Sequence, residues 1–264
     1  MNTAFKDSLG KPTLKVGAFL VESVSPGIGE ICKVAGCDFA TLDLEHTGFT
    51  FETAKSVAKY MHAADLPLIV RIPSREYHDI SRALDVGADG VMLPMVSSIE
   101  EARHIVKSAK YFPEGMRGVA VGLAQDRFRS SPLPEAFRNN NRRTILALQI
   151  ENTAGVEAAD AIAALEGVDI LWVGHWDLSV SLGIPGQLDH PEFKRAIERV
   201  NMACRKHGKS MARVANSVEE SIELYRSGFD VQTYQSDVAL LKNAMTKGIS
   251  EMRSACASAK ANAK

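Results

Sequence analysis

The sequence has no stretch of about 18 uninterrupted apolar residues, the length that a membrane-spanning helix requires. Its first segment, residues 1–15, also lacks the apolar core of a secretory signal peptide. These two absences argue against an integral membrane protein and against secretion. We therefore expect a cytoplasmic protein that has no membrane partner.

Neither sign of charge is in excess, and cysteine is scarce. The 31 basic and 32 acidic residues are interspersed and give a formal net charge of −1, so nothing indicates a nucleic-acid partner. The four cysteines form no C-x-x-C pair and no cluster with histidines at zinc spacing, which indicates buried or inert thiols. Small-molecule chemistry is the remaining default.

Apolar segments typical of strands alternate with helical patterns almost throughout the 264 residues. The expected strands are 16–20, 39–44, 68–72, 90–95, 145–151, 170–174, 209–214 and 231–235. The expected helices are 26–36, 51–64, 76–87, 98–110, 154–165, 191–208, 217–228 and one from about 237. Eight such units predict an α/β fold, a closed (β/α)8 TIM barrel that forms a single domain over residues 1–264.

Two segments depart from this rhythm. Residues 111–143 are long and rich in Gly, Pro, Arg and Asn, and so long an insertion in a compact domain is usually functional or part of an interface. The last helix, from about residue 237, is expected to pack on the barrel or on a neighbouring subunit.

Polar residues gather where the predicted strands end, and in barrel enzymes the active site lies at that rim. Strands two and three end near Asp43, Glu45, His46 and Arg71, whereas strands five and six end near Gln149, Glu151, His175, Trp176 and Asp177. The convergence of charged groups and imidazoles on one rim predicts a catalytic site.

Glu151 and Asp177 end consecutive strands, which lie about 4.8 Å apart in a sheet, so both carboxylates can reach one cation. Two protein carboxylates leave most of an octahedral shell to waters and substrate, an arrangement that suits Mg²⁺ or Mn²⁺, with Co²⁺ or Zn²⁺ as alternatives. The competing interpretation is that they are two solvated acids at strand ends.

His46 is the best candidate for the general base, because imidazole titrates near neutral pH. A histidine that only supports the structure is the alternative, and Asp43, Glu45 and Asp85 all remain candidates to orient the ring. Arg71 could grip a substrate carboxylate or an enolate oxygen, or pair with Glu45 as scaffold.

The lack of certain residue types at the rim argues against two kinds of site. A Schiff-base aldolase needs a lysine there, but Lys15 and Lys209 enter their strands from the opposite end, which disfavours imine chemistry. The segments after strands seven and eight contain Asn216 and Ser236 without glycine, which makes a phosphate site unexpected.

At these residues the sequence resembles the HpcH/HpaI family of class II, metal-dependent pyruvate aldolases, over roughly residues 14–245. The matching segments are LDLEH (42–46), IVRIP (69–73), LDVGADGVMLPMV (84–96), YFPEGMRG (111–118), QIEN (149–152) and VGHWDLS (173–179). The resemblance implies metal ligands at Glu151 and Asp177, an acid/base His46 supported by Asp85, and an Arg71 that holds the enolate. It also implies that Gln149 contacts the oxo acid.

The activity that this resemblance implies is the reversible cleavage of 4-hydroxy-2-oxo acids into pyruvate, or a related 2-oxo acid, and an aldehyde, through a metal-bound enolate. It further implies a homo-oligomer, a hexamer built as a trimer of dimers, in which Asp85 acts from a neighbouring subunit.

One motif departs from the family pattern. Where relatives have Gly-Pro-Ala-Asp or a close variant, this chain has Gly174, His175, Trp176 and Asp177, with Gly174 expected to border the substrate. Trp176 either narrows the aldehyde side of the pocket or reaches a subunit contact. His175 is either a pocket wall or a second acid/base. Leu44 also replaces a smaller residue.

Two other function classes stay open at this point. A Claisen-type synthase or lyase would use the same metal enolate with an acyl-CoA partner, for which a basic surface is available at Arg127, Arg129, Arg138, Arg142 and Arg143. A barrel that only binds or scaffolds is disfavoured, because no motif position has lost its chemical group.

Overall fold

In the computed structural model, which describes residues 3–262, eight parallel strands close into a barrel in chain order. All eight predicted strands are confirmed, and β1 closes the ring by pairing with β8, with Lys15 opposite Val231. The strands are β1 (Lys15–Leu20), β2 (Phe39–Asp43), β3 (Leu68–Arg71), β4 (Gly90–Leu93), β5 (Ile145–Ile150), β6 (Ile170–Val173), β7 (Ser210–Ala215) and β8 (Val231–Tyr234). The predicted TIM barrel is therefore confirmed.

Alternate residues of each strand separate two apolar layers. Inward-facing side chains such as Phe39, Ile69 and Met92 form one buried cluster, and outward-facing ones such as Leu42 and Val70 join the helices in a larger cluster. The short helix α1 (Ala4–Ser8) covers the amino end of the barrel. The resulting core fixes the strand ends that carry the polar residues.

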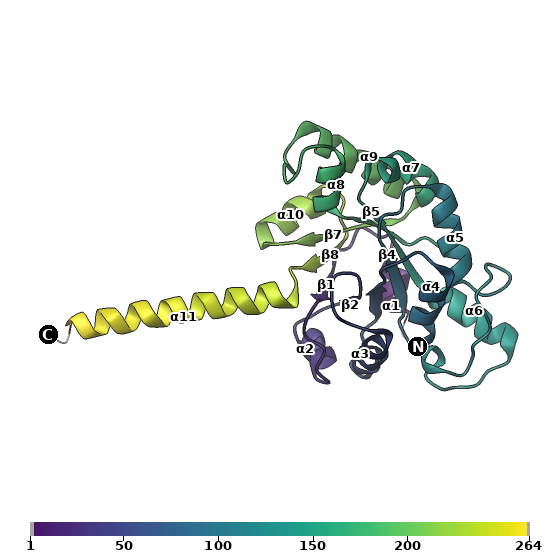
Figure 1. Cartoon of the computed structure of the whole chain (residues 1–264), viewed down its shortest axis with the longest axis horizontal. Coiled ribbons are helices and arrows are strands. Elements are labelled where there is room, and N and C mark those ends of the chain that lie inside the picture. Colours follow the sequence, from purple (N-terminus) through teal and green to yellow (C-terminus); the bar gives the residue numbers. More distant parts are fainter. Residues whose placement is uncertain (1–2, 263–264) are drawn as a thin grey trace.

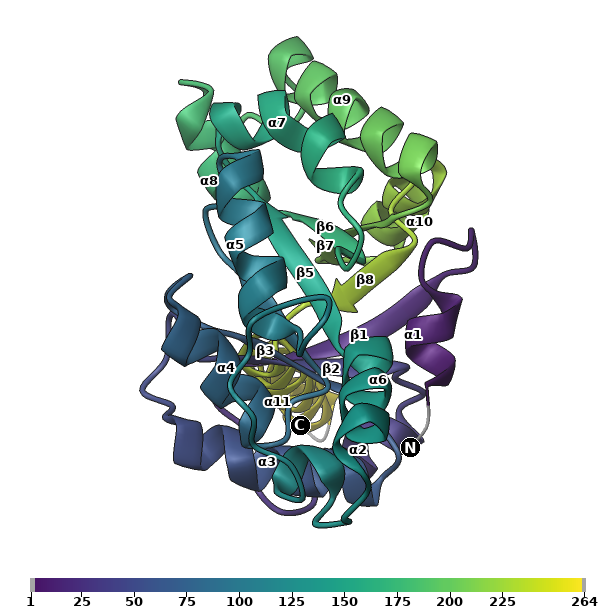
Figure 2. The same ribbon diagram turned by 90° about the vertical axis from the view of Figure 1, so that its right-hand side faces the viewer.

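The eight predicted helices are present. All but the last surround the barrel, and the last extends away from it (Figures 1 and 2). They are α2 (Ile28–Val34), α3 (Phe51–Ala63), α4 (Tyr77–Asp85), α5 (Ile99–Ala109), α7 (Thr153–Ala163), α9 (Pro191–His207), α10 (Val218–Arg226) and α11 (Asp237–Asn262). Four further pieces were not predicted: α1, η1 (Ala124–Asp126), α6 (Leu133–Arg143) and α8 (His175–Ser181). Each is short or rich in poor helix formers.

The insertion at 111–143 contains η1 and α6. Its asparagines hold it in place: the Asn141 side chain exchanges two hydrogen bonds with the backbone of Tyr111, and Asn140 donates to Asp126. The Tyr111 ring stacks on Phe137 with centroids 4.9 Å apart. Tertiary hydrogen bonds therefore order a segment that its composition marks as irregular.

The final helix, α11, leaves the barrel and extends away from it (Figure 1). Its Asp237 carboxylate accepts hydrogen bonds from the backbone N–H groups of Val21, Glu22 and Ser23, which ties its first turn to the end of β1. Along its length it carries an exposed apolar stripe of Val238, Leu241, Met245, Ile249 and Met252. The sequence predicts that this helix packs either on the barrel or on a neighbouring subunit, and its packing on a neighbouring subunit stays a prediction.

No helix within residues 3–262 combines the length and the apolar character needed to cross a membrane.

Candidate active site

A pocket of about 500 Å³ opens at the carboxyl end of the barrel, where the predicted site residues were expected to meet. Its lining includes seven of them: His46, Arg71, Gln149, Gly174, His175, Trp176 and Asp177. Phe19, Trp172 and Val214 form apolar parts of its wall. Glu151 and Asp85 are not among the lining residues.

Glu151 lies buried directly behind this lining, with 3% of its surface exposed. Its Oε1 accepts a hydrogen bond of 2.6 Å from the backbone N–H of Met95, and its Oε2 is bound by the Gln149 amide. The pKa of the Glu151 carboxyl is raised to about 7, chiefly by burial and also by the negative charges of Asp177 and Glu45, while the hydrogen bonds from Met95 and Gln149 oppose the rise. Like charges and burial thus concentrate negative potential at one place.

Gly174 leaves the room that this carboxylate occupies. A Cβ at residue 174 would collide with Oε2 of Glu151 and also crowd the Gln149 amide, at 2.9 Å. The glycine is therefore needed for close approach and not for an unusual backbone angle.

We expect Gly174→Ala to displace the Glu151 carboxylate and to lower kcat/KM by about 100-fold, since misplacing a reacting group by about 1 Å has that cost. Steady-state kinetics and thermal unfolding would measure it. Gly27→Ala is the matched control, because a Cβ there meets no atom within 4 Å. Equal activity of the two variants would contradict the role of Gly174.

The residues present fit a divalent cation. Glu151 and Asp177 supply carboxylate oxygens, and Oε1 of Gln149 is buried without a hydrogen-bond partner. In the described part of the chain, no group of three or more His, Cys, Asp or Glu side chains is arranged to hold a metal. Two carboxylates plus a neutral oxygen match an open site for Mg²⁺ or Mn²⁺ better than a closed zinc site.

Arg71 does not present its whole guanidinium to the pocket. Its Nε and Nη2 donate to the two carboxylate oxygens of Asp43 at 2.8 and 2.6 Å, and Nε also lies 3.3 Å from Glu45. The group stands 5.2 Å above the Phe19 ring. The scaffold partner is therefore Asp43 more than Glu45, and the fork expected to grip a substrate is used internally. The two N–H groups of Nη1 and the second N–H of Nη2 remain to donate to a substrate.

The His46 side chain is 66% exposed at the mouth of the pocket. Its Nε2 lies 3.6 Å from Oε2 of Glu45. Of the three acids that sequence left open, Glu45 is therefore the one nearest to the ring within this chain.

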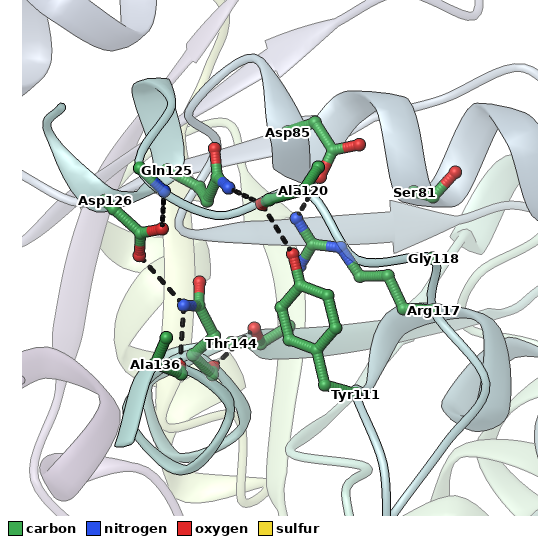
Figure 3. A network of polar contacts seen from close by, with 12 residues as sticks. Ser81, Asp85, Tyr111, Arg117, Gly118, Ala120, Gln125, Asp126, Ala136 and Thr144 are labelled. Carbon is green, nitrogen blue, oxygen red and sulfur yellow. Dashed lines mark hydrogen bonds and ion pairs between the residues drawn. The ribbon is translucent and has the colours of Figure 1, made fainter. Parts of the chain in front are cut away.

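Asp85 lies elsewhere. It ends α4, which runs back toward the amino end of the barrel, and its Oδ1 accepts a hydrogen bond of 2.5 Å from Arg117 (Figure 3). Arg117 is almost fully buried and stands 4.6 Å above the Tyr111 ring. The structure does not bring Asp85 to the pocket of its own chain.

His175 and Trp176 begin helix α8 and do not continue the strand. Their rings lie 4.9 Å apart, and Trp176 is 58% exposed while His175 is buried. Burial, with a contribution from the charge of Arg213, lowers the pKa of His175 to about 3. His175 therefore stays neutral, which favours the wall over a second acid/base.

Sequence reasoning missed part of the lining. From the sequence, Asp43 is expected on the rim only as a partner of His46, Asn216 and Ser236 count only against a phosphate site, and Gln235 has no expected role, although all four line the pocket. The rule that polar residues at strand ends meet at one rim would have found them, because Asn216 follows β7 and Gln235 follows β8.

A barrel with an acidic cation site, a histidine and an arginine at its carboxyl rim defines a class of enzymes that stabilise an oxyanion. The chain belongs to a family in this class: residues 15–244 match the model of the HpcH/HpaI aldolase/citrate lyase family. The resemblance of the sequence to class II aldolases is thereby confirmed, and the chain is an enzyme of the carbon–carbon lyase type.

Individual relatives and solved structures also match the chain over most of its length. The chain is 32% identical over 243 residues to 5-keto-4-deoxy-D-glucarate aldolase of Klebsiella pneumoniae subsp. pneumoniae, covering 92% of this chain and 94% of that one. The crystal structure of the HpcH/HpaI aldolase from Desulfitobacterium hafniense DCB-2 superimposes with a TM-score of 0.89 at 31% identity, covering 96% and 97%. The citrate synthase SbnG superimposes with a TM-score of 0.83 at 26% identity, covering 96% and 98%.

Proposed function

We propose that this chain cleaves 4-hydroxy-2-oxo acids to pyruvate, or a related 2-oxo acid, and an aldehyde, and also catalyses the reverse addition. One observation carries the proposal: the Asp177 carboxylate and the orphaned Gln149 oxygen line one pocket with His46 and Arg71, and the buried Glu151 carboxylate lies directly behind this lining. The aldolase name of the relative at 32% identity supports it.

Glu151 and Asp177 would hold a divalent cation, Mg²⁺ or Mn²⁺ by the oxygen chemistry of the donors. When bound, that cation supplies positive charge to the oxygens of the 2-oxo acid. Gln149 would contact the same end of the substrate. Glu151 is buried, and the Met95 N–H holds its carboxylate in place at this end.

His46 would take the proton of the 4-hydroxyl group. The bond between carbons 3 and 4 then breaks, its electron pair forms the enolate of the 2-oxo acid, and the 4-alkoxide becomes the aldehyde carbonyl. Arg71 Nη1 would donate to the developing negative charge while Asp43 holds the rest of the guanidinium. Protonation of carbon 3 completes the release of the 2-oxo acid.

The test is pyruvate release from a panel of 4-hydroxy-2-oxo acids, with and without a chelator. The proposal requires release that stops on chelation and returns when Mg²⁺ or Mn²⁺ is added. Full turnover after exhaustive metal removal, or trapping of a substrate imine by borohydride, would contradict it.

The Claisen-type alternative has one supporting observation, the likeness to citrate synthase SbnG. None of the five arginines that the sequence offers for the required basic surface is among the residues that line the pocket. Arg129, Arg142 and Arg143 line a separate cavity with Thr3, next to α1 at the amino end of the barrel. The aldolase is therefore the better supported function.

We also propose that the protein acts in the cytoplasm as a homo-oligomer, a hexamer of three dimers. The exposed stripe on α11 borders a cavity of about 900 Å³ whose lining includes Leu241, Met245 and Ile249, and burying such a surface against a second copy would stabilise assembly. Assembly would also be the way for Asp85, which Arg117 holds at the surface, to reach His46 of a neighbouring subunit.

Trp176→Ala separates the two expected roles of the indole. If Trp176 narrows the aldehyde side, the variant should change relative kcat/KM among aldehydes by about ten-fold or more, because one methylene alone is worth about 1–3 kcal/mol. If it contacts a neighbouring subunit, light scattering should show weaker assembly with the aldehyde ranking intact. No change in either measurement would make Trp176 a filler of the rim.

A further inference from the structure

The pocket has a second polar wall that the proposed chemistry does not use. It is formed by Asn216, Gln235 and Ser236, which follow β7 and β8. Counted round the ring from β5, β7 is two positions away and β8 is three, so the wall faces the Glu151 side of the pocket, where the enolate would form. A group beyond carbon 4 of the substrate would meet this wall.

The wall is held rigidly. Gln235 has a left-handed backbone with φ of 55°, and its N–H donates to Ala215 O at 2.8 Å. Its side-chain Nε2 donates to Asn216 O at 2.6 Å, and its Oε1 accepts from Asn243 at 3.1 Å. An uncommon backbone conformation fixed by three hydrogen bonds is typical of a site that orients a ligand.

The wall offers a ligand both a hydrogen-bond acceptor and a hydrogen-bond donor. Asn216 turns its Nδ2 to Glu220 at 3.1 Å, so its Oδ1 is left as an acceptor that no residue in 3–262 engages. Ser236 Oγ accepts the N–H of Ala239 at 3.3 Å, so its hydroxyl proton is left to donate. A substrate hydroxyl both donates and accepts and satisfies both groups, whereas a carboxylate only accepts and would face the Asn216 oxygen.

The charges around the pocket also favour a substrate hydroxyl over a carboxylate. Asp43 and Asp177 line it, and the positive charge of Arg71 is already paired with Asp43. Phe19, Trp172 and Val214 add apolar surface. A second carboxylate on the substrate would lose water against acidic and apolar neighbours, which is unfavourable without a cation beside it.

We propose that Asn216, Gln235 and Ser236 form the subsite for the aldehyde portion and select an uncharged, hydroxylated aldehyde over one that ends in a carboxylate. This proposal rests on the proposed aldolase function. It assigns a substrate class that the relatives' names do not give, because 5-keto-4-deoxy-D-glucarate carries a carboxylate at each end.

The test compares three aldehydes as acceptors for pyruvate. Glyceraldehyde and tartronate semialdehyde differ only in a terminal CH₂OH or carboxylate, and propionaldehyde lacks both hydroxyls. We expect kcat/KM for glyceraldehyde to exceed each of the other two by about ten-fold or more, since sites built to bind a hydroxyl reject analogues that lack it. A preference for tartronate semialdehyde, or equal use of all three, would overturn the proposal.

Two variants locate the preference. Asn216→Ala and Ser236→Ala should each lower kcat/KM for glyceraldehyde by about three- to ten-fold, the value of one hydrogen bond, and leave propionaldehyde unchanged. Ser217→Ala is the matched control, because Ser217 caps α10 beside Asn216 but does not line the pocket. An equal loss for both aldehydes would show that the wall has only a structural role.

Exchange of the pyruvate methyl protons in D₂O, followed by NMR, distinguishes a failure of the proposed subsite from a failure of the proposed aldolase function. Exchange reports enolate formation without any aldehyde. Loss of exchange in the wild-type protein would overturn the aldolase itself, whereas exchange together with the wrong aldehyde ranking would overturn only the subsite.

Discussion

Asp177→Asn should lower pyruvate release by about 100- to 1,000-fold at a fixed Mn²⁺ concentration, because a metal ion contributes several kcal/mol of charge stabilisation to the transition state. Asp177 is exposed and makes no hydrogen bond or ion pair to another side chain in the described part of the chain, so the change removes charge without leaving a broken contact. It also removes one of the like charges that raise the pKa of Glu151. The metal-free variant should therefore be at least as stable as the metal-free wild type.

Metal-dependent stability gives a readout that does not depend on turnover. A cation that binds only the folded wild type should add about 2.7 kcal/mol at 100 times its Kd and raise Tm, whereas the variant should gain little at the same concentration. Isothermal titration with Mn²⁺ would measure the affinity directly. A wild-type Tm shift retained in full by the variant would remove Asp177 from the metal site.

Asp189→Asn provides the control for loss of a surface carboxylate. Asp189 is fully exposed, pairs with Lys194 at 3.1 Å and lies outside the pocket lining. This variant should match the wild type in both activity and metal response. Glu151→Gln is a less clean test, because both Glu151 oxygens accept hydrogen bonds and an amide can accept only through one.

The repeating elements were predictable because local pattern determines them. Each strand combines apolar residues with a buried position in the ring, and helix starts such as Ser98 and Asn152 carry caps that the structure shows in use. The short helix α8 was not, because seven residues directly after a strand give no periodic signal. In α6 the Asn-rich sequence opposes a helix, and the hydrogen bond from Asn140 to Asp126 reverses that preference.

The residues that gather at the site were predictable from the sequence, but the hydrogen bonds and ion pairs between them were not. Ends of parallel strands meet at one rim, so the acids, Arg71 and His46 could be grouped from sequence alone. Which acid binds Arg71 depends on register: Asp43 on β2 lies directly opposite Arg71 on β3, and both face inward. The proposed contacts between subunits, which would bring Asp85 to a site and cover α11, are not encoded in any local pattern.

Arg71→Lys should lower kcat/KM by about 100-fold or more while keeping the positive charge. Nε and Nη2 of Arg71 bind Asp43 at 2.8 and 2.6 Å, which leaves the two N–H groups of Nη1 and one of Nη2 for the substrate. A lysine has one nitrogen, so it can neutralise Asp43 or reach the enolate oxygen, but its geometry does not allow both. The loss should appear in kcat as well as kcat/KM, because the contact strengthens as negative charge develops.

Some stability should also be lost, because Asp43 is only 1% exposed and gives up one of two charge-assisted hydrogen bonds, each worth about 1.5–3 kcal/mol. Arg213→Lys is the matched control. Arg213 is equally buried, with a side chain 7% exposed, and binds Glu220 at 2.8 Å, but it does not line the pocket. Both variants should lose similar stability in thermal unfolding, while only Arg71→Lys loses activity. If Arg71→Lys kept wild-type kinetics, or if both variants lost activity in parallel with Tm, Arg71 would be scaffold alone.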